Sequence, residues 1–133
     1  MSILSKSQIL NSKLPTKDIP TPEWGDDNIP ENERMTRIAM ISGLQRQEYL
    51  EALQKVREEC KDNEDLFVLR FQDTKYLFLS LCIVDESCRT IFSKDEVKQL
   101  ASTCAQVTDR LFGEAQRFNG VQSKEAVEDI EKK

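Results

Sequence analysis

IFSKDEVKQLASTCAQVTDRLFGEAQRFNG, residues 91–120, is the most strongly patterned stretch of the chain. Ser93 and Glu96 have the spacing of a capping box, in which each side chain accepts a hydrogen bond from a backbone N–H at a helix start. At about 100° per residue, the apolar side chains that follow share one arc of about 140°. They are Val97, Leu100, Ala101, Cys104, Val107, Leu111, Phe112, Ala115 and Phe118. Asn119 and Gly120 tolerate the left-handed backbone that commonly ends a helix. The stretch predicts one amphipathic helix that packs against a core or a partner.

Two further helices are predicted before this stretch. Ser42 and Gln45 form a second capping box, and apolar residues at helical spacing extend to about Lys61. Residues 66–84 can form one buried helix, or two strands over 67–71 and 76–84. The run is rich in leucine rather than β-branched residues until Ile83 and Val84. Its composition therefore favours the helix.

The N-terminal third has a different character, because Pro15, Pro20, Pro22 and Pro30 exclude regular helix there. Residues 16–24 can form an edge strand, residues 34–41 a second strand, and the turn residues over 25–32 can join them into a ragged hairpin. Residues 1–14 can hold a short helix started by Ser5 or Ser7.

These elements predict a single domain over residues 1–133 that is mainly α, with four to five helices and a short N-terminal β-hairpin, at the margin of the α+β class. Its parts are a mobile segment over 1–14, an extended hairpin region over 15–41, a helical core over 42–120 and a short, frayed tail helix over 121–133.

The composition excludes several classes of function. A net charge of −5 with interspersed acids and bases argues against nucleic-acid binding, which needs a basic surface. The most apolar run, residues 76–84, is about half the length that a membrane-spanning helix needs. The N-terminus lacks the apolar run of a signal peptide. We therefore expect a cytosolic protein that binds neither nucleic acid nor membrane.

The chain offers little for catalysis. It has no histidine, and its carboxylate pairs, such as Asp85 with Glu86, are adjacent in sequence, so on a helix they would not face each other. The four glycines form no phosphate-binding loop. The four cysteines include no close pair: Cys60, Cys82 and Cys104 have apolar neighbours typical of buried thiols, and Cys88 lies in a polar turn. We predict no enzyme, no cofactor and no metal.

What remains is recognition of another polypeptide. The candidate surfaces are the apolar run that contains Tyr76 and Phe78, and the helix face that contains Leu111, Phe112 and Phe118. Trp24, the single tryptophan, either pins the hairpin onto the helices or anchors a partner.

A set of short motifs occurs in an order that spans nearly the whole chain. They are Thr21-Pro22-Glu23-Trp24-Gly25, Val84-Asp85-Glu86, Ile91-Phe92-Ser93, Asp95-Glu96-Val97, Leu100, Leu111-Phe112, Ala115 and Asn119. This order resembles the tail assembly chaperones of long-tailed bacteriophages and prophages. Cys88 departs from the pattern, because the turn after Asp-Glu in such proteins often has Gly or Asn.

The resemblance implies a non-catalytic protein of the host cytoplasm that binds the tape measure protein and keeps it soluble for tail tube polymerisation. Such a protein is absent from the mature virion. The tail tube protein and other copies of this chain are further candidate partners. A head or tail completion component retained in the virion, or a small acidic regulatory binding protein, stays open as an alternative.

Overall fold

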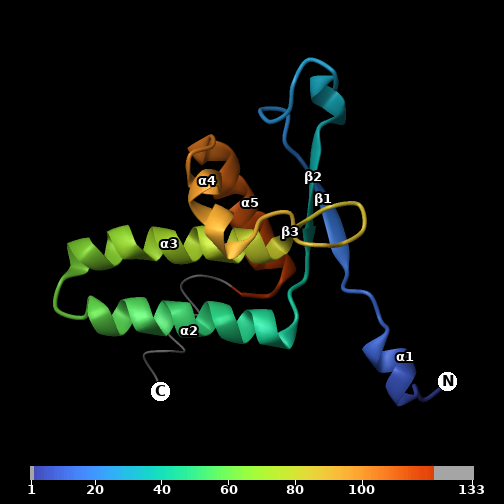
Figure 1. The fold of residues 1–133 in the computed structure, drawn as a ribbon, viewed down its shortest axis with the longest axis horizontal. Helices are drawn as coiled ribbons and strands as arrows, with labels where there is room; N and C mark the ends of the chain where they lie inside the picture. Colours follow the sequence, from blue (N-terminus) through green and yellow to red (C-terminus); the bar gives the residue numbers. More distant parts are fainter. Residues whose placement is uncertain (1, 122–133) are drawn as a thin grey trace.

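A computed structural model describes residues 2–121, in which a small sheet lies at one end of a group of helices (Figure 1). Within these residues the fold is mainly α, with five α-helices and a three-stranded antiparallel sheet, as predicted. In chain order the elements are α1 Lys6–Leu10, β1 Thr16–Pro20, the 3₁₀ turn η1 Glu31–Glu33, β2 Met35–Ala39, α2 Gly43–Glu59, α3 Glu64–Cys82, β3 Ile83–Val84, the 3₁₀ turn η2 Lys94–Glu96, α4 Val97–Ala101 and α5 Ala105–Phe118.

The predicted hairpin is present. Strands β1 and β2 pair antiparallel from Thr16 opposite Ala39 to Pro20 opposite Met35. A third strand, β3, was not predicted: it pairs with the other edge of β2, with Ile83 opposite Ile38. The helix predicted over 66–84 therefore ends at Cys82, where β-branched residues that favour extended backbone begin.

Helices α2 and α3 lie side by side as an antiparallel pair (Figure 1). The capping box predicted at Ser42 starts α2: the backbone N–H of Gln45 donates to Ser42 Oγ over 3.2 Å, and that of Ser42 donates to Gln45 Oε1 over 2.9 Å. The side chain of Asn63 caps α3 by accepting from the N–H of Leu66 at 3.0 Å. Residues 66–82 are thus helical, and the alternative of two strands is wrong.

The single helix predicted over 93–119 is wrong, because the chain forms η2, α4 and α5 in its place. The capping box of Ser93 and Glu96 is present, but it starts the 3₁₀ turn η2. The chain leaves the helix at residues 102–104, where the hydroxyls of Ser102 and Thr103 donate to the carbonyls of Gln99 and Leu100 over 2.6 and 2.7 Å. Hydroxyls that bond to nearby carbonyls compete with helix continuation.

Cys104 is exposed and occupies the N-cap position of α5, contrary to its predicted burial. Cys60 and Cys82 are buried, as predicted. At the far end of α5, Gly120 takes the left-handed backbone with φ +68°, while Asn119 stays right-handed at φ −89°. The expectation that both residues suit a left-handed position is therefore met by Gly120 alone.

The N-terminal helix predicted after Ser5 or Ser7 is α1, which Ser5 starts with a capping box. None of its residues is buried. The tail helix predicted over 121–133 lies, apart from Val121, outside the described residues.

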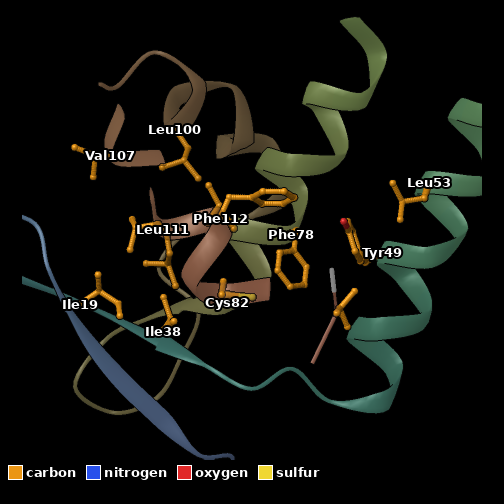
Figure 2. Close-up of a cluster of buried hydrophobic side chains, with 14 residues drawn as sticks. Ile19, Ile38, Tyr49, Leu53, Phe78, Cys82, Leu100, Val107, Leu111 and Phe112 are labelled. Atoms are coloured by element: carbon orange, nitrogen blue, oxygen red, sulfur yellow. The ribbon is translucent and has the colours of Figure 1, made fainter. Parts of the chain in front are cut away.

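The core lies where α2, α3 and α5 meet the inner face of the sheet (Figure 2). Phe78 of α3 is at its centre: its ring lies 4.5 Å from the ring of Tyr49 and meets that of Phe112 edge-on at 5.7 Å, measured between centroids. Ile19 and Ile38 contribute from the sheet. Because fully burying each such side chain contributes about 1.5–3 kcal/mol, this cluster holds the three helices and the sheet as one body.

Within the described residues, no helix combines the length and the apolar character that crossing a bilayer would require.

Candidate partner-binding groove

A groove of about 550 Å³ runs over α3, with α2 on one side and η2 and α4 on the other. Its apolar surface comes from Ala52 of α2, Tyr76 and Leu77 of α3, and Val97 and Ala101 of α4. Three acidic and three basic side chains surround this surface. They are Glu48, Glu51, Asp73, Lys55, Lys94 and Lys98. An apolar floor inside a rim of both charges suits an amphipathic helix.

The floor of the groove is held firmly from below. Tyr76 and Leu77 directly precede Phe78, whose ring is locked between Tyr49 and Phe112 in the core. Burial of the Tyr49 hydroxyl raises the pKa of that group above its usual value, so it stays neutral. A rigid floor costs little ordering entropy when a partner binds.

Tyr76 is also fixed from the side by Lys75. The Nζ atom of Lys75 lies 5.2 Å from the centroid of the Tyr76 ring, within the range of a cation–π contact. Lys75 is buried and forms an ion pair with Asp109 of α5. The Lys75 ammonium group thus has a carboxylate and an aromatic ring as neighbours, and both contacts help to hold Tyr76 in place.

An ion pair joins the two walls of the groove. Lys94 Nζ of η2 lies 2.5 Å from Glu48 Oε1 of α2. The hydrogen bond to Glu48 raises the pKa of Lys94, so the lysine remains charged at neutral pH. The two side chains belong to different elements, so this ion pair is a tertiary contact between the two walls of the groove.

The structure places the six predicted partner-binding residues in three different environments. Phe78, Leu111 and Phe112 are buried in the core, and Phe118 is partly buried against it. Tyr76 lines the groove. Trp24 lies in a second cavity, described below. Partner binding at these six positions stays a prediction, and of the six only Tyr76 belongs to the groove.

Comparison with known proteins adds information on the fold. No protein-family model matches this sequence, and no curated protein matches it. Among solved structures, the chain is similar to "Structure of bacteriophage HK97 tail assembly chaperone", with a TM-score of 0.60 and 18% identity. The match covers 82% of this chain and 92% of that one.

The fold is that of the HK97 tail assembly chaperone. The resemblance to tail assembly chaperones found in the sequence motifs is thereby confirmed at the level of the fold. The match covers most of both chains, so it is not confined to an isolated helix pair.

The second cavity, of about 490 Å³, lies between the hairpin loop, the outer face of β2 and the turn after β3. Trp24 packs against the core at one side of it, as expected if this residue pins the hairpin. Its Nε1 atom is buried and has no hydrogen-bond partner within residues 2–121. Arg34 fixes the loop by donating to the carbonyls of Pro22, Asp26 and Ile29 at 2.7–2.9 Å.

Over the described part of the chain, no cluster of three or more His, Cys, Asp or Glu side chains could hold a metal ion. Cys82 has a pKa raised to about 12, chiefly by burial, so its thiol is neutral rather than a nucleophilic thiolate.

Sequence reasoning missed most of the groove. Val97 and Ala101 stood on the predicted apolar face, but their position opposite Ala52 depends on the break at residues 102–104. The charged rim residues gave no signal, because isolated charges on helices are usually simply solvated. The one usable signal was Tyr76, an aromatic residue at the edge of an apolar run.

Proposed function

We propose that this protein is a phage tail assembly chaperone that binds the tape measure protein and keeps it soluble until the tail tube polymerises. The observation that supports the proposal most directly is the similarity to the HK97 tail assembly chaperone over most of both chains. It acts without catalysis, in the host cytoplasm, and is absent from the mature virion.

The groove supplies a physical mechanism for the proposed binding. A long helical protein exposes apolar stripes that aggregate until other subunits cover them. An amphipathic helix can lay such a stripe on Tyr76, Leu77 and Val97, while its flanking charges meet the mixed rim. The net charge of −5 keeps the chaperone itself soluble.

The experiment is co-expression with the tape measure protein encoded in the same phage or prophage. Ala101→Glu places a carboxylate on the groove wall at an exposed position, where it does not disturb the core. Ala105→Glu is the matched control, because Ala105 is also exposed and lies outside the groove. The readouts are the soluble fraction of the tape measure protein and its co-purification with the chaperone.

We expect the wild type and Ala105→Glu to keep the tape measure protein soluble and to co-purify with it. Ala101→Glu is expected to bind it at least about tenfold more weakly, because its carboxylate would be buried in an apolar contact. Equal solubility of the tape measure protein without any chaperone would overturn the proposed function. Equal binding by Ala101→Glu would overturn the groove as its site. Mass spectrometry of purified particles tests the remaining part, because a virion component would be found there.

A further inference from the structure

The second cavity, between the hairpin loop and the turn after β3, is surrounded by apolar side chains that the protein leaves in water. Ile29, Met35 and Ile91 line it and are between 47% and 52% exposed. They come from three separate segments: the hairpin loop, β2 and the loop before η2. The cavity and the groove share no lining residue. Exposed apolar side chains that converge on one hollow are typical of a binding site.

Two hydrogen-bond donors of the cavity lining have no acceptor among residues 2–121. One is the indole N–H of Trp24, whose Nε1 atom is buried and unpaired. The other belongs to the hydroxyl groups of Thr21 and Thr36, which bond to each other over 2.8 Å. Each hydroxyl has one hydrogen, so their mutual bond uses one and leaves the second without an acceptor. Because unpaired buried donors cost free energy, a ligand that supplies acceptor atoms is favoured here.

The charges around the cavity favour a cationic ligand. Arg37 donates to both carboxylate oxygens of Asp18, at 2.7 and 3.2 Å, so these two charges compensate each other. Three exposed carboxylates of the lining form no ion pair within the range that the structure describes. They are Glu33, Asp85 and Glu86. They outnumber the one remaining cation of the lining, Arg34. An anionic acceptor is therefore disfavoured, and the acceptor has to be neutral.

A peptide carbonyl is a neutral acceptor that comes with apolar and cationic side chains. Carbonyls inside a helix already accept from the helix itself, whereas those of an extended segment are free. We propose that the cavity binds an extended segment of a partner polypeptide, in which an apolar side chain stands beside a lysine or arginine.

Each part of the cavity has a role in this contact. The apolar side chain packs among Ile29, Met35 and Ile91, and a backbone carbonyl accepts from the indole N–H of Trp24. The cation lies near the three carboxylates. The groove suits a helix and the cavity suits an extended segment, so the two sites take differently shaped partners. Binding at the cavity does not depend on the proposed binding of the tape measure protein.

The single tryptophan makes a direct test possible. In a proton–nitrogen correlation spectrum of the labelled protein, Trp24 gives one indole N–H signal, which moves downfield when this group donates to a carbonyl. The probe is a set of capped hexapeptides with Leu, Ile, Met or Phe near the centre and a lysine on either side of it. A matched set has glutamate in place of both lysines.

At least one lysine peptide is expected to move the Trp24 indole signal downfield until the shift saturates. The corresponding glutamate peptide is expected to bind at least about threefold more weakly, as for the loss of a few exposed charge pairs. Ile29→Ser with Met35→Ser is expected to weaken binding about tenfold, because apolar surface is no longer covered. Both side chains are about half exposed, so the fold is retained. The other backbone signals of the spectrum check this.

Leu44→Ser is the matched control, because Leu44 is 81% exposed and lies at the start of α2, outside the cavity. It is expected to bind the peptide like the wild type. The proposal is overturned if no lysine peptide shifts the indole signal in a saturable way, if the Ile29 and Met35 variant binds as tightly as the control, or if the glutamate peptides bind equally well. Ala101→Glu, in the groove, is expected to leave peptide binding unchanged, so failure at one site is distinguished from failure at the other.

Discussion

Gly120 shows how one backbone angle ends a helix. With its φ of +68°, the chain turns so that the N–H of Val121 donates to the carbonyl of Gln116 at 2.8 Å. The N–H of Gly120 donates to the carbonyl of Arg117 at 3.2 Å. This is the Schellman arrangement, and the buried side chain of Val121 completes it. The positive φ, rather than a lack of space, is what requires glycine, because a Cβ atom at Gly120 would meet nothing within 4 Å.

Gly120→Ala is expected to lower the free energy of unfolding by about 1 kcal/mol, because the left-handed backbone conformation is sterically unfavourable for a residue with a Cβ atom. Gly43→Ala is the control: its Cβ would also meet nothing within 4 Å, but its φ is not positive. This second change should be neutral or stabilise by up to about 1 kcal/mol. Denaturant unfolding measures both, and equal effects of the two substitutions would contradict the backbone explanation.

Cys88 is a second position of positive φ, at 65°, and it is not a glycine. It lies in a tight turn in which Asp85 Oδ1 accepts from the backbone N–H groups of Ser87 and Arg89 at 2.8 and 3.0 Å. Gly and Asn, the residues that the resemblance leads us to expect in this turn, are the ones that best tolerate a left-handed backbone. The sequence marked Cys88 as unusual, and the structure shows that it lies in the tight turn between the bridge partners Val84 and Thr90.

At the scale of elements, the break between α4 and α5 is the main difference from the sequence-based prediction. The helical spacing of apolar residues predicted the buried face correctly at four positions. They are Leu100, Val107, Leu111 and Ala115. Ala101 and Cys104, in the same predicted stripe, are exposed. A regular period can continue across a short break, so periodicity alone did not reveal that the chain leaves the helix at Ser102.

Cys104→Asp is expected to stabilise the protein by about 1 kcal/mol, because a carboxylate at the N-cap can accept a backbone N–H and favours the positive end of the helix dipole. Cys104 occupies the N-cap of α5 without a side-chain capping bond. Cys104→Ala is the control, which removes the thiol without adding an acceptor. Thermal and denaturant unfolding would contradict the prediction if the two variants were equally stable.

At the scale of the whole molecule, polar contacts between distant segments connect the hairpin loop and the residues after β2 to α5 and its C-cap. Arg110 donates to both carboxylate oxygens of Glu23 at 2.8 and 2.9 Å, and these bonds lower the pKa of Glu23 to about 2. Asn119 Oδ1 accepts from the N–H of Ile41 at 2.7 Å, at the junction of β2 and α2. These pairs are separated by 87 and 78 residues, so no local pattern could predict them.

Global stability is expected to fall on the alkaline side because of Cys82. Its pKa is raised from 9.0 to about 12 in the folded protein, chiefly by burial. Below pH 9 the Cys82 thiol is neutral in both the folded and the unfolded protein, so its burial stabilises the fold fully. Between these values only the unfolded chain loses the proton, so the free energy of unfolding falls by up to about 1.4 kcal/mol per pH unit as pH rises.

The measurement is the free energy of unfolding against pH for the wild type and Cys82→Ala. The variant is less stable at neutral pH, because it leaves a small cavity. Its decline over this alkaline range should nevertheless be shallower than that of the wild type. Parallel curves would show that Cys82 does not titrate as described.

Signals that act over a few residues were enough to predict the capped starts of α1 and α2, the hairpin of β1 and β2, the helical state of residues 66–82 and the family resemblance. Caps, prolines and apolar periods act locally, so each can be recognised in the chain. The groove, β3 and the burial of Phe78, Leu111 and Phe112 depended on tertiary packing. An apolar stripe marks a helix face that will be covered, and only the surrounding elements settle whether the chain's own core or a partner covers it.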